Sequence, residues 1–216
     1  MEQFEKLISM IDLVQFEKEI RLNPHTKFES KDVESVKNAD LNVIIHVAEL
    51  YAIGSSVITP NPQLSFEICK LCVELGYVDG YGLLADYYEN GIGTENDYHL
   101  SLTILLEGAK KGSLYCMVKL VNRNQMHRIV FDGISILDEE EEFQWLHRAA
   151  ELGYTPSFIP LGLRYQCGSG TQQSRDKAEF WYNKAKEAGI ETSMDYLMDI
   201  WQQKWSEKYN EAKVQD

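Results

Sequence analysis

A phrase that recurs about every 36 residues constrains the fold of this chain more than any other feature. Each copy is an apolar run closed by a glycine, and the closing glycines are Gly76, Gly112, Gly153 and Gly189. Their separations are 36, 41 and 36 residues, counted from 76 to 112, 112 to 153 and 153 to 189. A period in this range is typical of stacked helical repeats, whose units bury their apolar faces against one another. The spacing therefore predicts an all-α solenoid.

Within each copy, the residue types fall into helical columns. Eight residues before the closing glycine the residue is large and apolar, and four residues before it the residue is small. The large column holds Ile68, Ile104, Trp145 and Trp181, and the small column holds Cys72, Gly108, Ala149 and Ala185. Positions four apart lie on one face of a helix, so this pattern lets a neighbouring helix approach closely. A glycine in the left-handed conformation then ends the helix.

A second phrase precedes each copy and closes on Gly54, Gly91 and Gly168. Three residues before these glycines stand Tyr51, Tyr88 and Tyr165, and six residues before them stand Ala48, Ala85 and Gly162. Each repeat is thus predicted to be a first helix with a tyrosine in its last turn, a turn, and a second helix. In the third unit two registers fit: Val118 and Val121 take the small and tyrosine columns, or Gly133 aligns with Gly91.

Residues 161–189, LGLRYQCGSGTQQSRDKAEFWYNKAKEAG, follow the pattern YxxGxG, a loop and AxxWYxKAxxxG. This pattern resembles the Sel-one-like repeat (SLR) family, whose members are related to tetratricopeptide repeats. Residues 84–112 match it well, and residues 1–40 lie outside it. The resemblance implies a right-handed α-solenoid of stacked antiparallel helix pairs. It also implies an adaptor or binding platform, since members of the family share no active site.

No linker rich in proline, glycine or serine divides the 216 residues, so we expect a single elongated domain. N-terminal capping helices are expected at residues 1–40, about four SLR units at 41–190, and a C-terminal capping helix at 191–216. Within the first segment, the apolar spacing predicts one amphipathic helix over residues 4–20, which stops before Pro24.

The chain is acidic, with 21 lysines and arginines against 34 aspartates and glutamates and a formal net charge of -13. This balance argues against binding to nucleic-acid backbones or to anionic membranes, and it favours a protein partner of basic character. The first residues, MEQFEK, lack the basic start of a signal peptide, so we expect a cytoplasmic protein. The sequence predicts no oligomeric state.

No pattern of catalytic or metal-binding residues stands out. Cys69 and Cys72 form a CxxC, but they occupy packing columns, and Cys116 and Cys167 stand alone, so no zinc site is expected. The five histidines are scattered and form no HExxH. The glycine pairs of the two GxG turns follow helices and lack a GK[ST], which indicates turns and not phosphate loops. We therefore expect a protein that is not an enzyme and that holds no cofactor.

Two surfaces are the candidate partner-binding sites. The first is the face of the first helices that the repeat seam leaves free, which lines the groove of a solenoid: Glu49, Asp86, Tyr87, Glu89, Arg164 and Gln166. Tyr87 is the expected anchor, because exposed aromatic residues supply much of the energy of interfaces. The second is the irregular stretch 123–142, which contains Arg123, His127, Arg128 and Phe131 and ends in the acidic run 138–142.

These observations predict a non-catalytic scaffold or adaptor that binds a protein partner in the groove of the solenoid. An alternative in the same class is a cytoplasmic bacterial immunity protein, which would occlude a toxin whose target site is basic. The contrasting class is an enzyme or enzyme subunit, and it would need a cluster of polar residues in the groove.

Overall fold

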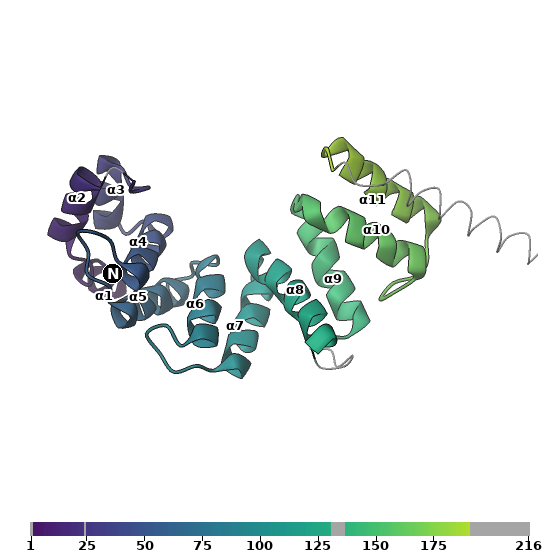
Figure 1. Ribbon diagram of the computed structural model, residues 1–216, viewed down its shortest axis with the longest axis horizontal. Helices are drawn as coiled ribbons and strands as arrows, with labels where there is room; N and C mark the ends of the chain where they lie inside the picture. The colour runs from purple at the N-terminus through teal and green to yellow at the C-terminus, as the bar shows by residue number, and fades with distance from the viewer. Residues whose placement is uncertain (1, 24, 131–136, 191–216) are drawn as a thin grey trace, which may run out of the picture. The chain divides into compact units, whose positions relative to one another are not determined.

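The computed structural model describes residues 2–23, 25–130 and 137–190, and within residues 125–130 it describes the backbone alone. All the regular elements of these residues are helical (Figure 1). The chain separates into two compact units, residues 1–133 and 134–216. The first unit contains α1 (Glu2–Ser9), α2 (Leu13–Leu22), α3 (Ser30–Lys37), α4 (Leu41–Ile53), α5 (Pro62–Glu74), α6 (Gly80–Asn90), α7 (Tyr98–Lys110) and α8 (Leu114–Val130). The second contains α9 (Glu139–Glu151), the 3₁₀ turn Thr155–Ser157, α10 (Phe158–Cys167) and α11 (Arg175–Glu187).

The helices begin and end where the repeat pattern predicts. The second helices begin after side chains that accept backbone N–H bonds, which satisfies donors that a helix start leaves unpaired. These caps are Asn61, Asp97, Asp138 and Ser174. The glycines that close the second helices all have a positive φ, between 73° at Gly189 and 104° at Gly112. The prediction of stacked helix pairs is confirmed.

Antiparallel partners pack directly: α4 lies on α5 and α6 on α7 in the first unit, and α10 lies on α11 in the second. The small column is what permits this approach. A Cβ atom on Gly108 would lie 2.6 Å from both the Cys116 sulfur and the Tyr81 Cβ. One on Gly162, at the small position of a first helix, would overlap the Tyr182 ring. Ala149 and Ala185 are buried at the equivalent positions. A larger residue in this column would force the helices apart.

The second glycine of each GxG turn is needed for two reasons. Gly93 and Gly170 both have φ of 69°, a region that residues with a Cβ rarely adopt. A Cβ on Gly93 would also collide with the Pro62 carbonyl, and one on Gly170 with the Glu139 carbonyl. Each turn therefore folds back onto the start of the preceding second helix. The interpretation of these glycines as turn residues is confirmed.

The N-terminal segment differs from the prediction. The expected single helix over residues 4–20 is wrong, because the chain breaks between α1 and α2. Asp12 caps α2 by accepting from the N–H groups of Val14 and Gln15, each at 3.0 Å, and its own N–H donates to the Tyr51 hydroxyl. The cap ties this break to α4. The single elongated domain stays a prediction, because the chain divides into two compact units. The capping helix expected at residues 191–216 lies outside the described residues.

Candidate functional site

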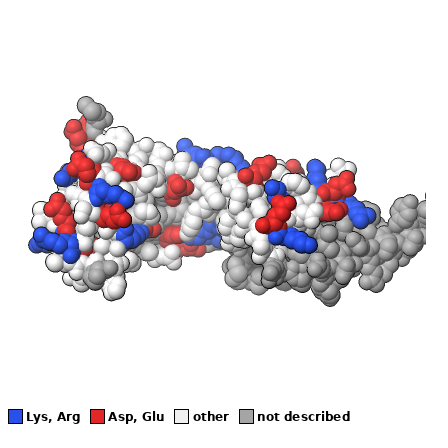
Figure 2. Space-filling view, turned by 90° about the horizontal axis from the view of Figure 1, so that it is seen from above, with Lys and Arg blue, Asp and Glu red and all other residues white. Residues whose placement is uncertain are grey.

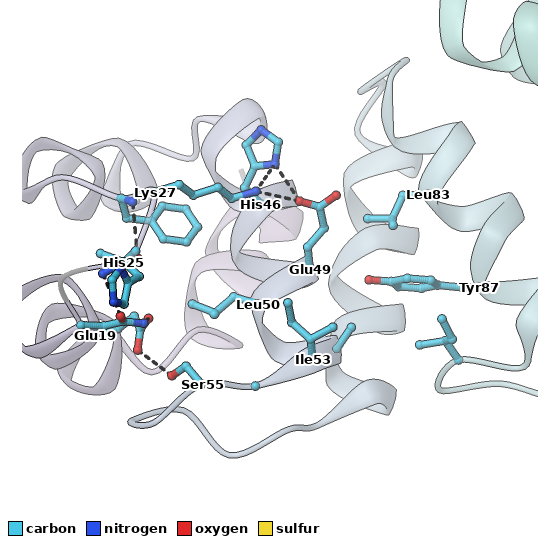
Figure 3. A pocket seen from close by; sticks show the side chains of 16 residues that line it. Glu19, His25, Lys27, His46, Glu49, Leu50, Ile53, Ser55, Leu83 and Tyr87 are labelled. Atoms are coloured by element: carbon cyan, nitrogen blue, oxygen red, sulfur yellow. Dashed lines mark hydrogen bonds and ion pairs between the residues drawn. The ribbon is translucent and has the colours of Figure 1, made fainter.

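A three-residue charge cluster marks the exposed side of α4. The Glu49 carboxylate accepts from Lys27 Nζ at 3.0 Å and lies 2.9 Å from His46 Nδ1 (Figure 3). Burial opposes ionisation of Glu49, but the hydrogen bonds from His46 and Lys27 outweigh it and lower the pKa of this carboxyl. Glu49 was predicted as a site residue. Lys27 and His46 were not predicted. Lys27 comes from a segment outside the repeats, and His46 stood in the sequence as one of five scattered histidines.

Beside this cluster the first unit has an open cavity of about 640 Å³. Most of its wall is apolar. The residues that line it come from α2, from the segment 25–28 that follows α2, from α4 and α6, and from the turns after these two helices (Figure 3). The principal apolar residues are Phe28, Leu50, Ile53, Leu83 and Ile92. A cavity of this size, with a few polar groups around apolar walls, has the properties of a binding site.

A second polar cluster links α6 to α8 within the first unit. Asp86 pairs with Lys119, and the Tyr115 hydroxyl donates to the second Asp86 oxygen at 2.8 Å. Burial, together with the nearby positive charge of Arg123, lowers the pKa of Lys119 to about 8. Asp86 was predicted to face the groove as a partner-binding residue. The structure instead places its carboxylate in contacts that hold two helices together.

Glu89 and Arg123, predicted on two separate surfaces, lie in contact. The Arg123 guanidinium pairs with Glu89, donates to Ser101 Oγ at 3.1 Å, and lies 5.6 Å from the centre of the Tyr98 ring. Arg123 is nearly buried, with 9% of its surface exposed. A buried guanidinium with these partners is a packing element between helices, so Arg123 is not an exposed residue of a loop.

Tyr87 is not exposed, and its assignment to the open face of α6 is wrong. Its side chain is 2% exposed, its hydroxyl lies 2.6 Å from Ser65 Oγ on α5, and burial raises its pKa to about 12. The register chosen from the sequence buried Tyr88, which is half-buried, in its place. The physical reason is that α6 packs on two sides: Ser101 on α7 donates to the Ala85 carbonyl, while Tyr87 faces α5.

In the second unit Arg164 and Gln166 are engaged inside the repeat. Arg164 pairs with Glu142, which is fully buried, and donates to Ser169 Oγ at 3.2 Å. The Gln166 side-chain oxygen accepts from the Tyr182 hydroxyl at 2.7 Å. Arg164 was predicted to line one groove with Glu49 and Asp86. It lies in the other compact unit, and its guanidinium is used for packing.

These contacts reveal a polar link that repeats between each second helix and the first helix that follows. Eleven residues before the closing glycines stand Ser65, Ser101 and Glu142, and they contact Tyr87, Arg123 and Arg164 respectively. Tyr87 and Arg164 share a sequence column, so Arg123 takes that column in the third unit. Val121 then occupies the small column and buried Asn124 the tyrosine column. Neither register weighed from the sequence is correct.

The rest of the irregular stretch is described only in part. The backbone of His127 and Arg128 belongs to α8, and Phe131 lies outside the described residues. At the far end, Asp138 caps α9 and forms a capping box with Glu141. Most of the acidic run thus stabilises a helix start, as carboxylates do near the positive end of a helix.

The two cysteines of the CxxC are packing residues. Cys69 and Cys72 are buried on α5, and burial raises the pKa of Cys72 to about 12 and that of Cys69 well above its usual value. Among the described residues no group of three metal-binding side chains gathers.

No helix within the described ranges is long and apolar enough to cross a bilayer. On the face shown in Figure 2, basic and acidic side chains lie beside one another with uncharged surface between them.

Comparison with known proteins shows which proteins this chain is similar to. The family model described as Sel1 repeat matches residues 70–113, 138–154 and 161–190. Two curated fungal relatives are each named chitin synthase regulator SKT5. The Saccharomyces cerevisiae protein is 31% identical over 141 residues, which cover 64% of this chain and 20% of the relative. The Malassezia restricta protein is 26% identical over 147 residues, 68% of this chain and 10% of the relative. The chain thus matches a fifth or less of these relatives.

Two solved structures share the fold. A Sel1 repeat protein from Oxalobacter formigenes has a TM-score of 0.53 at 19% identity, covering 69% of this chain and 58% of its own. A protective antigen of uropathogenic Escherichia coli with an SLR fold has a TM-score of 0.57 at 23% identity, covering 74% of this chain and 33% of its own. At these identities the likeness concerns the fold alone.

Proposed function

Because the chain is a Sel1-like helical repeat protein, we propose that it is a non-catalytic regulatory adaptor that binds a segment of a partner protein. The observation that carries this proposal is the 31% identity over 141 residues to a protein named as a regulator of chitin synthase. Repeats of this kind stack into surfaces that bind other proteins. The partner enzyme that fits this relative is a chitin synthase.

The surface we assign to the partner is the side of α4 and α6 in the first unit that carries the cavity and Glu49. Ile53 exposes 79% of its surface there, and Leu50 and Leu83 lie beside it. Asp86 and Glu89 border the same helices but are paired with Lys119 and Arg123. They therefore fix the relative placement of α6 and α8, and the apolar residues supply the contact area.

A segment exchange tests this function. In yeast that lacks its own SKT5, the matched 141-residue segment of the regulator is replaced by this chain, and chitin synthase activity is measured in isolated membranes. We expect the chimaera to precipitate with the synthase and to raise its activity above that of a regulator from which the segment is deleted. A control chimaera carries the repeats of the Escherichia coli antigen, which share the fold at 23% identity.

If the chimaera with this chain is folded and abundant but behaves like the control chimaera, the regulatory function is refuted. The alternative of a bacterial immunity protein stays a prediction from the sequence, and so do a cytoplasmic location and the basic character of the partner.

A further inference from the structure

The cavity of the first unit exposes a large apolar side chain, Ile53. Ile53 at the end of α4 is the most exposed large apolar residue among those that the structure describes. It lies next to Leu50, and Leu83 on α6 faces it (Figure 3). Ile92 also lines the cavity. Apolar side chains gathered in a concavity of about 640 Å³ lose contact with water when another apolar group fills it.

One wall of the cavity carries a buried carboxylate, Glu19, which is 1% exposed. Its two oxygens accept from Asn23 Nδ2 and from Ser55 Oγ, each at 2.6 Å. No lysine, arginine or histidine forms an ion pair with it within the described part of the chain. Buried carboxylates are ordinarily paired with a cation, and each oxygen of Glu19 has a further lone pair to offer.

The carboxylate at the other rim of the cavity already has partners within the chain. Glu49 is held between Lys27 and His46, so its charge is balanced by residues of the chain itself. His25, also at the cavity, donates its backbone N–H to the Asn23 side chain. The two ends of the cavity therefore differ. The charge of Glu49 is balanced by Lys27, whereas Glu19 has only the neutral partners Asn23 and Ser55.

We propose that this cavity binds a short segment of a partner protein in which a bulky apolar side chain stands beside a lysine or arginine. The apolar side chain lies against Ile53 and Leu83, and the cationic group pairs with Glu19. This inference rests on the proposed adaptor function and specifies the chemistry of the bound segment. The argument for a cationic segment is charge complementarity to a carboxylate that is buried at the cavity wall.

Fluorescein-labelled nonapeptides of three designs test the inference by anisotropy with the full chain. One design places two leucines beside lysine and arginine, the second replaces the basic pair by two glutamates, and the third replaces the leucines by serines. We expect the first to bind at least about tenfold more tightly than either of the others, equivalent to about 1.4 kcal/mol. Equal affinity for the basic and acidic designs, or no binding of the first, overturns the inference.

Two variants then locate the bound peptide. Ile53→Glu places a charge on the apolar floor, and because this side chain is exposed the fold should be retained, as checked by circular dichroism. Glu19→Gln keeps an acceptor for Ser55 and removes the charge. Both should weaken the leucine and basic peptide about tenfold. The matched control is Val14→Glu, since Val14 is an exposed residue of the same unit outside the cavity.

The outcomes separate this inference from the proposed function. If the segment exchange succeeds with a chain that carries Ile53→Glu, the adaptor function holds and the cavity is not the binding site. If the peptides bind as expected and the exchange fails, the cavity is a binding site and the regulatory function is refuted.

Discussion

Replacing Arg164 by alanine should destabilise the second unit, because the guanidinium of Arg164 balances the charge of the buried Glu142 carboxylate. Glu142 is fully buried, and the Arg164 side chain is 13% exposed. Removing one partner of a buried ion pair costs about 3–5 kcal/mol, since the other charge stays in a medium of low polarity. Arg164 retains some contact with water, so we expect a loss of about 3 kcal/mol, the lower end of that range.

The distribution of tryptophans provides a selective assay. All four tryptophans of the chain, Trp145, Trp181, Trp201 and Trp205, lie after residue 134. Tryptophan fluorescence during urea unfolding therefore reports on the second unit, and far-ultraviolet circular dichroism reports on both. The Arg164→Ala variant should lower the fluorescence midpoint and leave the part of the dichroism transition that belongs to the first unit unchanged.

A control and a double variant make the measurement decisive. Arg148→Ala removes an exposed arginine of the same unit and should change the stability by no more than about 0.5 kcal/mol. Combining Arg164→Ala with Glu142→Ala removes both charges, so the loss should be smaller than the sum of the two single changes. An Arg164→Ala midpoint equal to that of Arg148→Ala would refute the structural role assigned to this pair.

Three further outcomes follow from the packing and the charges. Ala185→Leu should overpack the buried seam of the second unit and cost about 1–3 kcal/mol by tryptophan fluorescence, and an unchanged midpoint would contradict the repeat register. Gly93→Ala should lower the thermal midpoint of the first unit more than Gly76→Ala, because both have a positive φ but only Gly93 lies against backbone. The lowered pKa of Glu49 implies that its contribution to stability is present above the unfolded pKa of about 4.3 and is lost as the pH falls through the folded value. Glu49→Gln should therefore weaken the pH dependence of urea unfolding below about pH 4.5, and an unchanged dependence would contradict this contribution.

The repeat architecture could be predicted from the sequence because its signals are local. Each glycine marks a helix end by its conformation, and small residues four positions before it mark the seam. The same reasoning failed at Tyr87, because it assumed one buried face for each first helix. In a stack a first helix packs against its own second helix and against the preceding one, so the buried stripe is wider. Leu50 and Arg164 occupy the same repeat position as Tyr87, four residues before the glycine. One is apolar and the other charged, so this position did not indicate burial from the sequence.

The candidate site could be predicted only in part, because it depends on contacts between distant segments. Glu49 was identified from its column, but Glu19 and Lys27 come from residues that the repeat pattern does not cover. Their place beside α4 depends on how α1 to α3 pack on the first repeat, which no periodicity specifies. Arg123 was selected for its charge. Its burial against Ser101 follows from the register of the third unit, which was ambiguous in the sequence because the separation of 41 residues there exceeds the usual 36 by five.

The proposal that this chain is a protein-binding adaptor is tested most directly by its affinity for a solubilised Saccharomyces cerevisiae chitin synthase in detergent. Biolayer interferometry with the immobilised chain should show saturable binding that is weakened at least about tenfold by Ile53→Glu and unchanged by Val14→Glu. Absence of saturable binding, or equal weakening by the two variants, would contradict the account.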